Sequence, residues 1–245
     1  MMTSWSPNKP LIKRLGSVNS TNETAISHLK NKDYFNWIIA DQQMDGRGRR
    51  GKAWSSPLGG LYATTVISDA KLDYTHVSQL SILSAVAAAK TIEDIIGKNK
   101  IQLKWPNDVF MGEKKLCGIL LESVFIENEL YLIVGFGLNV RYTHDKNNTA
   151  FSYLQEVQKN VSIDECLDKL ILNFNKIINI WNYGESFTHL KDYWLMLTRD
   201  HGRLIKAKKK NIMIEGLFED IDDQGNLILR VGSEREIINT GDIFS

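Results

Sequence analysis

Three apolar strand segments that follow one another closely constrain this fold more than any other feature of the sequence. They are the stretches IQLKW, KKLCGILLESVF and ELYLIVGFGLNV, at residues 101–105, 114–125 and 129–140. Parallel neighbours in a sheet need a crossover of a dozen or more residues, and these connections are too short for one. The segments therefore predict a largely antiparallel or mixed sheet, and the helices predicted around them place the chain in the α+β class.

Helices are predicted on both sides of these strands along the chain. Residues 78–97 form the clearest one, because they are rich in Ala, Leu and Ile and end at a glycine. Capping-box spacing, a Ser followed three residues later by a Glu, predicts further helix starts at Ser20 and Ser162. Three shorter candidates remain, a helix at 186–197 and strands at 36–40 and 61–68.

The pattern of the sequence changes after Arg199, from predicted helices to short predicted strands. Short alternating strand candidates follow, including KAKKKNIMIEGLF, and Gln224, Gly225 and Asn226 supply turn material. We therefore expect two domains, a large one over residues 1–199 and a small β-barrel over residues 200–245.

The chain as a whole carries little net charge, +1 at neutral pH, so it has no general attraction for nucleic acid or membrane surfaces. Cys117 and Cys166 are far apart and the histidines lack metal-ligand spacing, so we expect neither a disulfide framework nor a metal cage. The first residues lack the apolar core of a signal peptide, and no apolar run is long enough to span a bilayer. These features predict a cytoplasmic protein.

The stretch DGRGRRGKAW, residues 45–54, matches parts of two nucleotide-binding patterns. Gly46, Gly48 and Gly51 give the G-x-G-x-x-G of dinucleotide folds, and the Lys that follows completes most of a P-loop. Both patterns need a helix directly afterwards, but the next residues, WSSPLGG, contain a proline and two glycines. Ala53 also replaces the hydroxyl residue that binds magnesium in a P-loop. What remains is a basic glycine loop, which suits a ligand with several negative charges, a plain solvated loop being the alternative.

Polar residues stand at the ends of the predicted strands, and glycines lie inside them. Lys104 in KWPNDV stands at a strand end, and Pro106 fixes the direction in which the backbone leaves the sheet. Lys115 opens the next strand, and Asn139 ends the one after it. Glycines interrupt these two strands at positions 118, 135 and 137, as happens where a ligand or another backbone segment approaches closely. Each feature has a simple explanation of its own: Lys104 as a surface lysine, the residues after Pro106 as a turn, and a strand glycine as a bulge. Taken together with the basic loop, these features suggest one ligand crevice.

Together, these motifs resemble the catalytic region of biotin protein ligases. The resemblance rests on STN at 20–22, Gln43, GRGRRGKAW, SSPLGGLY, KWPNDV, KLCGILLE and GFGLNV, which follow the family's order across residues 11–140. It implies an α+β domain with a mixed sheet, related to class II aminoacyl-tRNA synthetases and lipoate ligases, followed by an SH3-like barrel. Because the matched region starts so early, we expect the monofunctional form, without the N-terminal winged helix-turn-helix of some members.

The resemblance implies a two-step reaction with ATP and biotin as substrates, accompanied by Mg2+. Biotin's carboxylate attacks the α-phosphorus of ATP to give biotinyl-5'-AMP and pyrophosphate, and an acceptor lysine then takes the acyl group. The implied partner is the biotin carrier protein domain of acetyl-CoA carboxylase or a related carboxylase, without DNA or membrane; homodimerisation stays open. Because carboxylate and triphosphate are both anions, this chemistry requires fixed cations.

Residue by residue, the resemblance implies catalytic roles for Lys104, Arg49 and Lys115. Lys104 would lie against the α-phosphate, Lys115 at biotin's carboxyl end, and Arg49 in the loop that closes over the adenylate. The residues implied to bind biotin or the adenylate are Ser20, Thr21, Asn22, Gln43, Arg47, Gly48, Arg49, Lys115, Gly118 and Asn139. No protein ligand for the metal is implied.

Three alternatives stay open at this point. A lipoate or octanoate ligase shares the fold and the adenylate chemistry but lacks this arginine-rich loop. A nucleic-acid-binding module would use GRGRRGK and KAKKK as basic patches and would lose affinity steeply with salt. The third alternative is a non-catalytic biotin sensor, but the presence of Lys104 and Lys115 argues against it. Departures from the family pattern at Met44, Asp45 and Cys117 concern the dynamics of the loop, and Trp54 is interpreted as a core aromatic outside the site.

Overall fold

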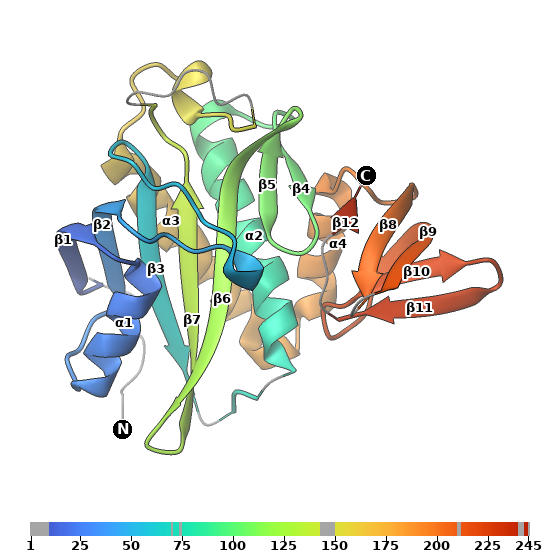
Figure 1. Ribbon diagram of the computed structural model, residues 1–245, viewed down its shortest axis with the longest axis horizontal. Coiled ribbons are helices and arrows are strands. Elements are labelled where there is room, and N and C mark those ends of the chain that lie inside the picture. Colours follow the sequence, from blue (N-terminus) through green and yellow to red (C-terminus); the bar gives the residue numbers. More distant parts are fainter. Residues whose placement is uncertain are drawn as a thin grey trace.

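Two sheets of unequal size lie side by side, with helices packed against the larger one (Figure 1). The computed structural model describes residues 10–69, 71–73, 75–142, 150–209, 212–239 and 243–244. Within these ranges the large sheet has seven strands, in the order β1-β2-β3-β7-β6-β5-β4, and the small one has five, in the order β11-β10-β9-β8-β12. The first nine residues of the expected large domain, and Lys210 and Asn211 in the expected barrel, lie outside the described residues.

The large sheet is antiparallel except at its first pair. β1 (Ile12–Val18) runs parallel to β2 (Trp37–Gln43), and the strands that follow pair antiparallel. They are β3 (Leu61–Ser68), β4 (Gln102–Lys104), β5 (Asp108–Met111), β6 (Lys114–Ile126) and β7 (Glu129–Leu138). This mixed sheet confirms the predicted α+β class, although the sequence pattern predicts neither β1 nor β5.

Helices cover both faces of this sheet. α1 (Thr21–Lys30) packs on one face, while α2 (His76–Ile96) and α3 (Ile163–Trp181) pack on the other (Figure 1). α4 (Phe187–Leu197) packs against α2 and α3, close to the small sheet. These helices confirm the predicted ones, and no helix within the described ranges is long and apolar enough to cross a bilayer.

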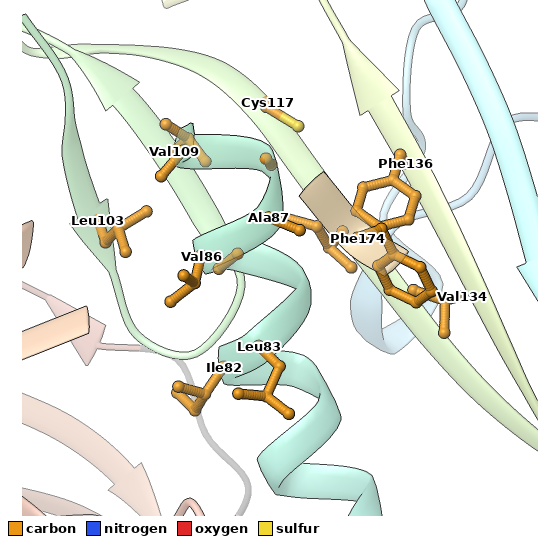
Figure 2. Close-up of a cluster of buried hydrophobic side chains, with 14 of the residues drawn as sticks. Ile82, Leu83, Val86, Ala87, Leu103, Val109, Cys117, Val134, Phe136 and Phe174 are labelled. Atoms are coloured by element: carbon orange, nitrogen blue, oxygen red, sulfur yellow. The ribbon is translucent and has the colours of Figure 1, made fainter. Parts of the chain in front are cut away.

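The apolar core between α2 and the sheet fixes which side chains point the other way. Leu103 of β4 and Val109 of β5 point toward Val86 of α2 (Figure 2), and all three are fully buried. Side chains alternate between the two faces of a strand, so their neighbours Lys104 and Asp108 project away from this core. The helical layer thus decides where the polar residues of KWPNDV lie.

Neither of the two predicted capping boxes forms. Ser20 and Ser162 are the N-cap residues of α1 and α3, as predicted, but neither side chain makes a capping hydrogen bond. At α1 a residue from another element takes over this function, because the Thr21 backbone N–H donates to Gln43 Oε1 over 2.9 Å. The spacing therefore locates both helix starts correctly and assigns the wrong hydrogen bonds to them.

The small antiparallel sheet fits the predicted SH3-like barrel. Its strands are β8 (Leu204–Lys209), β9 (Ile212–Ile221), β10 (Leu227–Val231), β11 (Glu234–Ile238) and β12 (Ile243–Phe244). The turn between β9 and β10 docks on α2 and on the β4–β5 turn: Gln79 of α2 donates to the Asp223 carbonyl over 2.6 Å, and the Trp105 indole donates to the Gly225 carbonyl over 3.3 Å. The small sheet is thereby held beside the β4–β5 hairpin.

Candidate active site

A cavity of about 450 Å3 opens where the start of α1, the basic glycine loop and the ends of β4 to β7 meet. Ile243 of β12 also lines it, so the small sheet contributes to its wall. The predicted site residues that line this cavity are Ser20, Thr21, Asn22, Gln43, Arg47, Gly48, Arg49, Lys104, Lys115 and Gly118. The sequence prediction of a single crevice is therefore confirmed.

The N-terminus of α1 forms a polar end of the cavity. Ser20, Thr21 and Asn22 are all buried, and Gln43 at the end of β2 holds Thr21 through both its backbone N–H and its hydroxyl, which donate to Oε1 over 2.9 and 3.1 Å. The Gln43 amide in turn donates to the Ser56 hydroxyl over 2.8 Å. A rigid set of amide and hydroxyl groups of this kind fixes the orientation of a polar ligand head.

Asn22 is anchored by hydrogen bonds from two directions. Its Oδ1 accepts from the Thr64 hydroxyl over 2.7 Å, and its Nδ2 donates to Glu122 Oε2 over 2.8 Å. Gly135 of β7 makes room for it, because a Cβ at that position would collide with the Asn22 amide oxygen. This strand glycine thus allows a side chain of the cavity to approach closely.

The basic glycine loop is a distorted hairpin that crosses the cavity mouth. Isolated antiparallel bridges join Gln43 to Ser56 and Arg47 to Ala53, and a single turn of 3-10 helix, Arg49–Gly51, forms its tip. The next element after it is the strand β3 and not an α-helix, in agreement with the rejection of the P-loop and dinucleotide patterns. The loop presents three cations to the cavity, Arg47, Arg49 and Lys52.

Trp54 lies in the wall of the cavity, so its interpretation as a core aromatic outside the site is wrong. Its ring packs over Gly118 and Gly137, where a Cβ would lie 3.0 Å from the indole at Gly118 and would collide with it at Gly137. The Lys115 ammonium lies 4.9 Å from the indole centroid, and Phe151 contacts the ring edge-on at 5.9 Å. The strand glycines that predict a close approach therefore admit this tryptophan.

The β4–β5 hairpin carries the KWPNDV motif into the cavity. A cis peptide bond joins Trp105 to Pro106, and the buried Asn107 amide donates to the Ile119 carbonyl of β6. These contacts hold the short turn, so that Lys104 and Asp108, which pair across the hairpin, project from the same face. Lys104 lines the cavity, and its ammonium lies 5.9 Å from the centroid of the Phe110 ring.

Lys115 forms an ion pair with Asp108 inside the cavity. Its Nζ lies 2.7 Å from Asp108 Oδ1, and about a quarter of each side chain is exposed. The pairing of β5 with β6 shifts register between Val109, which pairs with Cys117, and Phe110, which pairs with Lys115. A β-bulge therefore lies next to Gly118, in addition to the close packing of Trp54 on that glycine. Gly118 leaves room for the Lys115 side chain, because a Cβ at that position would lie 3.1 Å from the Lys115 ammonium.

Asn139 lies near the cavity but does not line it. Its backbone N–H donates to the Leu116 carbonyl over 3.0 Å, and its side-chain amide donates to the Lys115 carbonyl over 3.4 Å. Its own carbonyl accepts from the Leu154 N–H over 3.1 Å. Asn139 therefore supports the backbone of Lys115, whereas Phe151, which the sequence analysis does not predict, lines the cavity directly.

The electrostatic character of the cavity is positive. Five cationic side chains line it and Asp108 is the one carboxylate among the described lining residues. Cys117, next to Gly118, belongs to the apolar core and is not among the lining residues, and burial raises the pKa of its thiol to about 12. Within the described ranges no cluster of three His, Cys, Asp or Glu side chains could hold a metal ion. Such a cavity suits a ligand with several negative charges.

Comparison with known families agrees with this geometry. The sequence model of the biotin/lipoate A/B protein ligase family matches residues 14–139, which contain all the cavity motifs up to β7. The chain belongs to this family. A second match, over residues 200–245, is to the biotin protein ligase C terminal domain, so the predicted family resemblance is confirmed.

Individual members of the family resemble the chain over most of its length. A biotin--[acetyl-CoA-carboxylase] ligase of Paracoccus denitrificans is 30% identical over 239 residues, which cover 94% of this chain and 98% of that protein. A bifunctional ligase/repressor of Bacillus subtilis is 28% identical, and the match covers 84% of this chain and 65% of that protein. The biotin protein ligase of Aquifex aeolicus in complex with biotin and ATP superposes with a TM-score of 0.81 at 26% identity, covering 96% and 97% of the two chains.

Proposed function

We propose that this protein is an ATP-dependent ligase that activates biotin as biotinyl-5'-AMP and transfers it to a lysine of a biotin carrier domain. The observation that carries the proposal is the single cavity, which combines a rigid polar end at α1 with five cations at the loop and at β4 to β6. The substrates biotin and ATP are those of the Aquifex relative, whose structure contains both, and biotin is also the substrate named for the Paracoccus relative.

In the first step a carboxylate oxygen of biotin forms a bond to the α-phosphorus of ATP. The bond from that phosphorus to the bridging oxygen breaks, and pyrophosphate leaves with the electron pair. In the second step the acceptor amine attacks the acyl carbon, the bond to the AMP oxygen breaks, and the amine loses a proton. Both steps develop negative charge on phosphate oxygens, which fixed cations stabilise without rearranging.

We propose for each residue the role that the family resemblance implies. Ser20, Thr21, Asn22 and Gln43 bind the ureido head of biotin at the polar end of the cavity, and Lys115 binds the carboxyl end. Lys104 lies against the α-phosphate, while Arg47, Gly48 and Arg49 cover the bound adenylate. Gly118 permits close approach, and Asn139 acts indirectly by supporting the Lys115 backbone. All but Asn139 line the same cavity, which supports this assignment.

We propose that Mg2+ accompanies ATP and is held mainly by phosphate oxygens and water. Asp108 is the one lining carboxylate in the described part, and it is already paired with Lys115. A magnesium ion bound through substrate phosphates needs few protein ligands. The metal would neutralise charge on the phosphates, while the cationic side chains position them.

We also propose an acceptor protein for the transfer step and a division of the chain into two domains. The acceptor is the biotin carrier domain of acetyl-CoA carboxylase or a related carboxylase, in keeping with the name of the Paracoccus relative. Residues 1–199 form the catalytic domain and residues 200–245 the SH3-like one. Use of ATP fits a reaction in the cytoplasm, and the reaction requires neither DNA nor a membrane.

The test is ATP–pyrophosphate exchange with purified protein, run with biotin, with lipoate and with neither. Exchange that depends on biotin supports the proposal, and subsequent labelling of a carrier domain tests the transfer step. Exchange with lipoate alone would keep the mechanism and replace the substrate. No exchange with either acid would overturn the proposed activation step.

A further inference from the structure

Arg199, at the junction between α4 and the small sheet, is built against the strand that carries Lys104. Its backbone N–H donates to the Leu103 carbonyl over 3.1 Å, and the Thr198 hydroxyl donates to the same carbonyl over 3.0 Å. β4 is the last strand of the large sheet, so these bonds occupy its outer edge one residue before Lys104. The segment Thr198–Arg199 therefore pairs with the free edge of β4, next to Lys104.

The Arg199 side chain is held on several sides although it lies near the surface. Its Nη2 lies 2.5 Å from Glu113 Oε2 in the β5–β6 turn, and its Nε lies 3.9 Å from Asp200 Oδ1. Only 12% of the Arg199 side chain is exposed, and Asp200 is fully buried with both carboxylate oxygens lacking a hydrogen bond in the described structure. Two carboxylates thus hold one guanidinium in place and offset its charge.

This fixed guanidinium packs on a ring of the cavity wall. Arg199 Cζ lies 5.3 Å from the centroid of Phe110, and the Lys104 ammonium lies 5.9 Å from the same centroid. Phe110 lines the cavity and lies on the same face of the hairpin as Lys104, whereas Leu103 and Val109 face α2 (Figure 2). A planar guanidinium stacks on an aromatic ring in a way that a lysine cannot reproduce.

We propose that Arg199 is a positioning residue: it fixes Phe110, and through it Lys104, for the nucleotide. This proposal rests on the function proposed above, in which Lys104 contacts the α-phosphate. Because two carboxylates offset the charge of Arg199, it acts through packing rather than through its own charge. Its loss should therefore weaken the interaction with ATP and leave the biotin end, at α1 and Gln43, unchanged.

The first test compares Arg199→Met, Arg199→Lys and Glu113→Gln by pyrophosphate exchange, with Kd for biotin measured by calorimetry. Arg199→Met is expected to raise KM for ATP about tenfold, with Kd for biotin changed less than about twofold, because displaced cations lose most of their effect. Arg199→Lys should restore only part of this loss. Glu113 is 84% exposed, so Glu113→Gln should fold normally and give a smaller increase in KM for ATP. Arg203→Met, in an exposed residue nearby, is the matched control and should behave like the unaltered protein.

A double-mutant cycle separates positioning from general stability. If Arg199 acts through Phe110, adding Arg199→Met to Phe110→Leu should cause no further increase in KM for ATP. Equal shifts for ATP and biotin, full rescue by Arg199→Lys, or additive effects in the cycle would overturn the inference. If the unaltered protein shows no biotin-dependent exchange, the proposed function fails instead, and Kd for ATP measured by calorimetry on the same variants still tests Arg199.

Discussion

Lys115 and Asp108 face each other from adjacent strands, with 2.7 Å between the Lys115 ammonium and a carboxylate oxygen, inside a cavity whose other charged lining residues, among those described, are all cations. The pair leaves the Lys115 ammonium partly exposed and able to meet a second carboxylate. Asp108 fixes the direction of the lysine but repels any anion that approaches it. The two charges therefore have to be tested together.

Lys115→Met should weaken biotin binding about tenfold or more, because it removes a charge-assisted contact and leaves the Asp108 carboxylate facing the carboxylate of biotin. Adding Asp108→Asn removes that repulsion, so the double variant should recover part of the affinity. Calorimetric titration with biotin measures both. A double variant that binds biotin more weakly than Lys115→Met would contradict this arrangement of charges.

Lys104→Ala should slow adenylate formation by about two to three orders of magnitude, as expected when one fixed donor to a developing charge is removed. Biotin should still bind, since the polar end of the cavity at α1 is unchanged. Pyrophosphate exchange measures the first effect and calorimetry the second. Wild-type exchange rates in this variant would remove Lys104 from the mechanism.

Arg49→Ala should accelerate release of the adenylate rather than destabilise the fold. Arg49 belongs to the tip of the glycine loop and is only partly buried, so its loss removes no core packing. Retention of radiolabelled adenylate after gel filtration, together with the melting temperature, distinguishes the two effects. A large fall in melting temperature with normal retention of adenylate would show that the loop arginine is structural.

Gly137→Ala should lower biotin affinity, because the added methyl group would collide with the Trp54 indole and push it into the cavity. Overpacking of this kind also costs about 1–3 kcal/mol of stability. Gly16→Ala in β1 is the matched control, since a Cβ there has no neighbour within 4 Å. Equal biotin affinities for the two variants, measured under conditions where both are folded, would show that Trp54 does not shape the site.

Both cysteines should resist thiol reagents in the native protein. Burial raises the pKa of Cys117 and of Cys166 to about 12, so at pH 8 both thiols stay protonated, and the thiolate is the reactive form. A chromogenic disulfide reagent should detect neither thiol in buffer and both after denaturation. Rapid reaction of one thiol in the native protein would reveal an opening of the sheet near that residue.

The sequence predicts the central strands and the helices well, because their apolar patterns are long. It misses β1, where charged residues interrupt the apolar pattern, and β5, which has only four residues and directly follows the Trp105–Pro106–Asn107 turn. Both strands form because the sheet supplies partners, β2 for one and β4 and β6 for the other. Tertiary pairing of this kind leaves little trace in a local pattern.

Most of the site is predictable because its residues lie in short motifs with unusual composition. Trp54 and Phe151 escape prediction because an aromatic residue in a cavity wall has the same local signal as one in the core. Ile243 escapes because it reaches the cavity from the small sheet, far away in sequence. Asn139 is the opposite case, since a polar residue at a strand end holds the neighbouring backbone instead of lining the cavity.

Because β4 has only three residues, a purified preparation has to be checked for the correct register of this strand. Leu103 belongs to the core and Lys104 to the cavity, so a slip of one residue in the pairing with β5 would exchange the two. The Leu103 carbonyl bonded to Thr198 and Arg199, and the Trp105 indole bonded to Gly225, pin the correct register from outside the sheet. A misregistered molecule could keep its other strands and helices and still be inactive, so specific activity per folded molecule, rather than melting temperature, reports whether β4 is in place.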